Sequence, residues 1–124
     1  MVLVDTSVWV AHLLEGNTGL EILLSDGDVI CHPLIIGELA CGNLKNRSEI
    51  LSLLESLPMA TQVEHDEVMQ FIENYHLMEK GLGYIDMHLL ASALLSKISL
   101  WTFDKKLNRV ALKLGLKFSR EIAG

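Results

Sequence analysis

The chain opens on Met1-Val2-Leu3-Val4-Asp5-Thr6-Ser7-Val8-Trp9, where a short apolar run ends at an acid. Val2-Leu3-Val4 has the β-branched, uninterrupted apolar character of a buried strand. Thr6 or Ser7 can cap a helix over residues 8–14. A strand without polar alternation that leads straight into a helix is typical of a parallel sheet covered on both faces.

The rest of the chain repeats this alternation of short apolar runs and helical patterns. Further strands are predicted at 29–31, 61–63, 100–103 and 117–118, and further helices at 18–25, 33–44, 48–57, 64–79, 86–96 and 104–114. Pro33 suits the first turn of a helix, and Pro58 ends one. No linker or repeat divides the chain, so we expect one α/β domain over residues 1–124.

Composition narrows the class of protein. Half of the 124 residues are hydrophobic and 21% are charged, which excludes intrinsic disorder. No uncharged run reaches the roughly 18 residues of a membrane span, and the acid at position 5 argues against a secretion signal. Cys31 and Cys41 match no zinc or redox spacing, so we expect free thiols in a reducing cytoplasm.

The formal net charge of -6 is unevenly distributed. Residues 1–96 carry 14 acids and three bases, whereas residues 97–124 carry seven bases and two acids. The bases Lys105, Lys106, Arg109 and Lys113 lie on one predicted helix, and Lys45 and Arg47 form a weaker group that we expect on the helix of Glu38. These six are candidate RNA contacts, although a solvated helix face explains the first four equally well.

Four acids stand apart from the solvated ones. Asp5 and Asp104 each follow a predicted strand, Asp86 begins a buried helix, and Glu38 lies in an apolar helix segment. In a doubly wound sheet, ligands bind at the carboxyl ends of strands. Converging carboxylates need a counter-ion, and hard cations such as Mg²⁺ or Mn²⁺ take oxygen ligands. Thr102 faces the same way as Asp104 on a strand and can support such a site.

Each acid also has an ordinary explanation. Asp86 and Asp104 can be helix N-caps, and Asp5 can be a loop acid after a strand. Glu38 is the hardest to explain in this way, although an ion pair with Lys45 or Arg47 is open to it. The four acids together are stronger evidence than any one of them.

Four motifs occur in an order and spacing that closely resemble the PIN-domain ribonucleases, in particular the VapC toxins of bacterial toxin–antitoxin pairs. They are Val2–Trp9, Ile36-Gly37-Glu38-Leu39, Asp86-x-x-Leu89-Leu90-Ala91-Ser92-Ala93 and Leu100-Trp101-Thr102-Phe103-Asp104. The resemblance covers essentially the whole chain. It implies a three-layer α/β/α domain with a short, mostly parallel central sheet.

The resemblance also implies a function. It is that of an Mg²⁺- or Mn²⁺-dependent endoribonuclease whose acidic site is Asp5, Glu38, Asp86 and Asp104, with Thr102, Thr6 and Ser7 in support. It implies a homodimer, a small VapB-like antitoxin, and structured RNA such as transfer RNA as substrate. Lys106 stands where some PIN domains have a further acid, which leaves open whether one ion or two bind.

A receiver-like signalling domain is the alternative from another class, since it has a similar length and an acidic Mg²⁺ site. Receivers usually carry adjacent acids after the first strand, whereas Asp5 has no acidic neighbour. The sequence therefore favours the nuclease.

Overall fold

A computed structural model describes residues 1–119 of the chain. The last five residues of the predicted domain, 120–124, lie outside the described residues. The described elements are β1 (Val2–Val4), α1 (Thr6–Glu15), α2 (Thr18–Ser25), β2 (Val29–Ile30), α3 (Pro33–Ala40), α4 (Arg47–Glu55), α5 (His65–Asn74), α6 (Tyr84–Ser96), β3 (Ser99–Trp101) and α7 (Lys105–Lys113).

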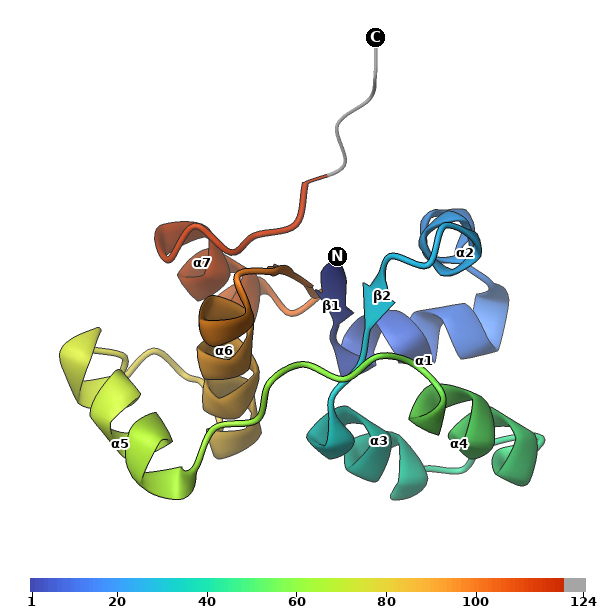
Figure 1. Cartoon of the computed structure of the whole chain (residues 1–124), viewed down its shortest axis with the longest axis horizontal. Helices are drawn as coiled ribbons and strands as arrows, with labels where there is room; N and C mark the ends of the chain where they lie inside the picture. Colours follow the sequence, from blue (N-terminus) through green and yellow to red (C-terminus); the bar gives the residue numbers. More distant parts are fainter. Residues whose placement is uncertain (120–124) are drawn as a thin grey trace, which may run out of the picture.

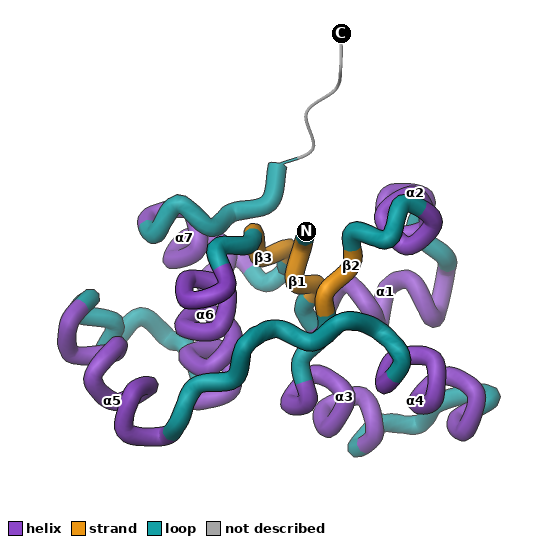
Figure 2. Tube along the Cα trace, viewed as in Figure 1, coloured by secondary structure: helices purple, strands orange, loops and turns teal. Residues whose placement is uncertain are grey.

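The strands form a small parallel sheet in the order β2-β1-β3. Figure 2 shows the three strands between helices on either side, which is the predicted three-layer arrangement. In the register, Leu3 faces Ile30 on one neighbour and Leu100 on the other. All three residues of β1 are buried, as a central strand covered on both faces requires.

Most predicted elements are confirmed, and the differences have local causes. The predicted helix 64–79 is shorter because α5 ends at Asn74, after which His76 and Glu79 have left-handed φ values of 53° and 62°. The predicted helix 33–44 ends at Ala40, with Cys41 as its C-cap. Asp5, rather than Thr6 or Ser7, is the N-cap residue of α1, so both hydroxyl residues lie in the first turn.

The predicted strand 61–63 is wrong. The segment after α4 meets the sheet earlier, where the Cys31 amide donates to Pro58 O at 2.8 Å and the Ala60 amide donates to Cys31 O at 2.8 Å. These two bonds make Met59 the partner of Cys31 in an isolated bridge. Lys117 likewise forms an isolated bridge with Leu100 in place of the predicted strand at 117–118.

The core is built on the sheet and the helices that cover it. Its fully buried large side chains are Leu3, Leu20, Ile35, Leu54, Leu89, Leu90, Leu100 and Leu107. No helix within residues 1–119 has the length and apolar character that crossing a membrane requires.

Replacing Leu3 by Ala tests the central position of β1. Leu3 is 0% exposed in the middle strand, so Leu3→Ala should lower the free energy of unfolding by about 3 kcal/mol through lost burial and a cavity. Leu14→Ala is the control, because Leu14 on α1 is 79% exposed and should change stability by less than about 0.5 kcal/mol. Urea denaturation measures both, and equal effects would contradict the assignment of Leu3 to the core.

Candidate active site

The predicted acids come from four places around the carboxyl edge of the sheet. Asp5 follows β1, Asp104 follows β3, Asp86 lies in the first turn of α6, and Glu38 lies on α3. Figure 1 shows α6 and α7 on one side of β1 and α3 on the other. The sheet thus places Asp5 between the elements that carry the other three acids.

Asp5 is 6% exposed, and its charge is stabilised by two hydroxyls. Thr102 Oγ1 donates to Asp5 Oδ2 at 2.7 Å, and Ser7 Oγ donates to the same oxygen at 2.8 Å. A hydrogen bond to a charged group stabilises it by about 1.5–3 kcal/mol. Among residues 1–119, Asp5 Oδ1 accepts no hydrogen bond, so this oxygen is available to a further partner.

The two hydroxyls are held in place by the loop after β3. The Phe103 amide donates to Ser7 Oγ at 3.0 Å, and the Asp104 amide donates to Thr102 Oγ1 at 3.0 Å. Each hydroxyl has one proton, and both protons are used on Asp5. The loop therefore orients both hydroxyls as donors toward the carboxylate.

Asp104 is the N-cap of α7, as the sequence allowed. Its Oδ1 accepts a hydrogen bond from the Leu107 amide at 2.9 Å, and the side chain is exposed. The capping role accounts for one carboxylate oxygen only. Its position beside the Thr102 hydroxyl keeps the residue at the edge of the sheet where Asp5 lies.

Asp86 is the third residue of α6, so the alternative that it is only the N-cap is not what the structure shows; Gly83 is the N-cap. Asp86 Oδ2 accepts from the Gly83 amide at 3.1 Å. Burial raises the pKa of Asp86, the Gly83 hydrogen bond opposes this, and the charges of Asp5 and Asp104 raise the pKa further. Asp5 and Asp104 are therefore close enough to disfavour the ionisation of Asp86.

Glu38 is half-buried and accepts a hydrogen bond from Thr6 Oγ1 at 2.7 Å. This bond joins α3 to the first turn of α1, one residue after Asp5. The alternative of an ion pair with Arg47 is not what the structure shows. Arg47 instead donates to the backbone oxygens of Ala40, at 2.6 Å, and Gly42, at 3.3 Å.

The donor set of this site suits a hard divalent cation. Within residues 1–119, no three His, Cys, Asp or Glu side chains lie close enough to hold one ion as they stand. The structure does bring three carboxylates within electrostatic reach, since the charges of Asp5 and Asp104 add to burial in raising the pKa of Asp86. Carboxylate oxygens under mutual repulsion are the ligands that Mg²⁺ and Mn²⁺ take.

The predicted basic residues fall into two groups. Lys105, Lys106, Arg109 and Lys113 are all exposed on α7, and we call them the basic face of α7. It begins directly after Asp104. Lys45 and Arg47 are not on the helix of Glu38 as expected, since Lys45 lies in the turn after α3 and Arg47 begins α4. The backbone bonds of Arg47 give it a structural role at the end of α3.

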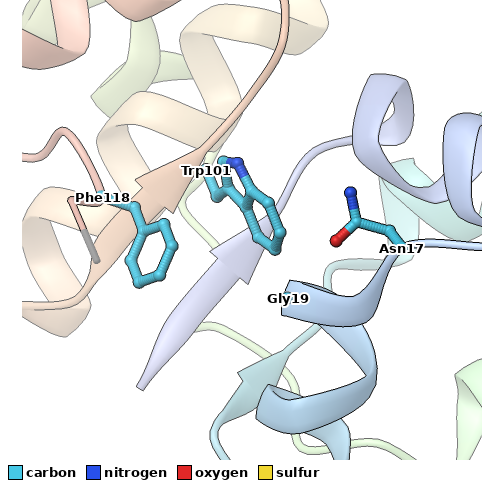
Figure 3. Close-up of a pocket in the computed structure, with 4 residues that line it drawn as sticks. All are labelled: Asn17, Gly19, Trp101 and Phe118. Atoms are coloured by element: carbon cyan, nitrogen blue, oxygen red, sulfur yellow. The ribbon is translucent and has the colours of Figure 1, made fainter. Parts of the chain in front are cut away.

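A pocket lies apart from the acids. It has a volume of about 320 Å³ and is lined by Asn17, Gly19, Trp101 and Phe118. Figure 3 shows the Trp101 ring between Phe118 and Asn17. None of the four acids lines it, so the candidate site is the carboxyl edge of the sheet and not this pocket.

The sequence reasoning missed His32, which the structure places beside the helices that carry two of the acids. His32 is 1% exposed, and its ring caps α3 by accepting the Leu34 amide at 3.0 Å. The signal in the sequence was its position just before Pro33, because proline at the first helical position makes the preceding residue the N-cap.

Comparison with known proteins agrees with this geometry. The PIN domain family model matches residues 2–113. Ribonuclease VapC32 of two strains of Mycobacterium tuberculosis, CDC 1551 / Oshkosh and H37Rv, is in each case 42% identical over 124 residues. The match covers 99% of this chain and 100% of each relative. The receiver alternative has no support from these matches.

The raised pKa of Asp86 predicts a change in stability. A raised folded-state pKa means that the contribution of Asp86 is fully present below the unfolded pKa and is lost as the pH rises through the folded one. In EDTA at pH 7, Asp86→Asn should therefore raise the Tm, since Asn can still accept the Gly83 amide. The gain should vanish by about pH 3, where carboxyls are protonated.

The Tm of wild type and of Asp86→Asn is measured by thermal melts between about pH 3 and pH 7. Glu73→Gln, an exposed acid near the end of α5, is the control and should show no such trend. A lower Tm for Asp86→Asn at pH 7 in EDTA would contradict the electrostatic coupling of the three aspartates.

Proposed function

Because this chain belongs to the PIN-domain family, and within it to the VapC group, we infer that it is an endoribonuclease and the toxin of a toxin–antitoxin pair. The observation that carries this inference is the convergence of Asp5, Asp86 and Asp104 at the carboxyl edge of the sheet. A metal-dependent hydrolase of phosphodiesters holds its ion with hard oxygen ligands of this kind.

We assign the metal site to Asp5, Asp86 and Asp104, with Glu38 as a further ligand or as the group that orients the attacking water. A bound Mg²⁺ or Mn²⁺ would lower the pKa of that water and stabilise charge on the scissile phosphate. Thr102 and Ser7 hold the carboxylate of Asp5 in place by donating to Oδ2. Thr6 orients Glu38 by donating to Oε1.

RNA is proposed to approach along the basic face of α7, where phosphates meet cations next to Asp104. The Lys106 side chain packs closely on Gly81. A Cβ built on Gly81 would stand only 2.8 Å from Lys106 Cδ. The Lys106 side chain therefore lies next to the loop that leads to α6 and Asp86. Lys45 is a weaker candidate, and the backbone bonds of Arg47 favour a structural role.

The finer points of the proposal follow from the VapC group. We propose a homodimer, a small VapB-like antitoxin that blocks the site, a structured RNA such as transfer RNA as substrate, and a cytoplasmic location. The free thiols of Cys31 and Cys41 are consistent with a reducing compartment. We propose one domain over residues 1–124, and the bridge from Leu100 to Lys117, which joins residues 114–119 to the sheet, supports this.

Asp5→Asn is the direct test of the activity. The Asn side chain can still accept from Thr102 and Ser7, so the fold should persist while a negative ligand is lost. Cleavage of RNA with Mg²⁺ or Mn²⁺ should fall by about 100-fold or more, the scale of losing one electrostatic stabiliser. Sequencing of RNA ends after induced expression compares the two proteins. Glu73→Gln should cut normally, and normal cutting by Asp5→Asn would overturn the assignment.

Binding of RNA tests the basic face of α7 separately from cleavage. In the Asp5→Asn background, Lys105→Gln with Arg109→Gln should weaken RNA binding and reduce the slope of log Kd against log salt by about 0.7 for each phosphate that is no longer neutralised. Lys97→Gln is the matched control. Lys97 lies just before β3, whereas Asp104 lies after it, so the two residues are at opposite ends of the strand. An equal effect of Lys97→Gln would show that overall charge matters and not this face.

A further inference from the structure

The imidazole of His32 lies between two helices that carry acids of the site. On one side, His32 Nδ1 accepts the Leu34 amide at 3.0 Å and so caps α3. On the other, His32 Nε2 lies 3.2 Å from Ser92 Oγ of α6, and both residues are buried. The ring therefore contacts both helices through separate nitrogens.

The protonation of the ring follows from its partners. Nδ1 accepts a backbone amide, so it carries no proton, and in neutral imidazole the proton is then on Nε2. Burial, with the nearby His88, lowers the pKa of His32 to about 4, so the ring is neutral at pH 7. Nε2 therefore donates to Ser92 Oγ, and the bond has a defined direction.

This bond joins two groups of helices. Helix α3 packs on α1 and α4, whereas α6 packs on α5 and β3. Figure 1 shows α3 and α4 on one side of the molecule and α5 and α6 on the other. Glu38 follows His32 by six residues on α3, and Asp86 precedes Ser92 by six residues on α6. At 1.5 Å per residue, each acid is about 9 Å along its helix from the bond.

We propose that His32 and Ser92 form a positioning pair that sets Glu38 relative to Asp86 and thereby the fit of the acidic site to a divalent cation. The pair touches neither the cation nor the RNA and acts only through the two helices. This rests on the proposed function, because it assumes that Glu38 and Asp86 serve one site.

Ser92→Ala is the cleanest variant, since Ala suits a buried helix and the change removes only the acceptor. The metal-free proteins are titrated with Mn²⁺ in a calorimeter. Ser92→Ala should bind Mn²⁺ about tenfold more weakly than wild type, the lower end of the loss seen when a residue that orients a metal ligand is removed. Ser96→Ala is the matched control. Ser96 is on the same helix and accepts the Thr61 amide at 3.1 Å, so its loss should leave Mn²⁺ binding unchanged.

Two substitutions of His32 separate positioning from capping. Asn can replace Nδ1 and keep the cap of α3, but it is too short to reach Ser92. Gln can reach Ser92 with its amide but caps poorly. If the pair positions the acids, His32→Gln should bind Mn²⁺ more tightly than His32→Asn, and adding Ser92→Ala to His32→Asn should weaken binding no further.

The outcomes decide the matter in each case. The proposal is overturned if Ser92→Ala leaves the Mn²⁺ affinity unchanged or changes it only as much as Ser96→Ala does. If His32→Asn binds Mn²⁺ more tightly than His32→Gln, His32 is a structural cap only. If either His32 variant shows no unfolding transition in a thermal melt, the result for Ser92→Ala decides alone.

In RNA cleavage, Ser92→Ala should lower kcat at saturating RNA and leave KM unchanged. Absence of cleavage by wild type would refute the proposed function, while the Mn²⁺ titration would still report on the pair.

Discussion

The carboxylate of Asp5 is the group on which the site depends, because it is charged and 6% exposed at the end of the central strand. A charge in that position is tolerated only when hydrogen bonds replace its water. Thr102 and Ser7 supply those bonds, and backbone amides of residues 103 and 104 hold the two hydroxyls in turn. The end of β3 is therefore joined to the end of β1 by the same hydroxyls that hold the carboxylate of Asp5.

The other acids are arranged around this centre by separate means. Asp104 begins α7 as its cap, and Asp86 bonds the amide before α6. Glu38 is held by Thr6, the residue next to Asp5. Each carboxylate thus has a structural bond that holds it and an oxygen left for chemistry. Burial raises the pKa of Asp86 most, and the charges of Asp5 and Asp104 raise it further; a bound cation would relieve this repulsion.

The elements that local pattern predicted well are those with an uninterrupted apolar run or a clear stop signal. β1 and β3, α2 and α6 follow such runs, and Asp104 was identified as a possible cap from its position before a helix. The wrong prediction of a strand at 61–63 has a clear cause. Met59, rather than residues 61–63, pairs with Cys31, because the backbone of Cys31 bonds to Pro58 O and to the Ala60 amide. The spacing of residues in the sequence does not indicate where a segment that returns from a helix meets the sheet.

The amino-acid sequence alone was enough to single out the candidate site: four acids after strands and on helices, with hydroxyls at positions 6, 7 and 102. The folded chain was needed to show which hydroxyl bonds to which acid, that Arg47 bonds to the backbone, and that His32 contacts Ser92. The reason is physical. Residue type and helical period are local properties, whereas a bond between residues 60 positions apart depends on how two helices pack on one sheet.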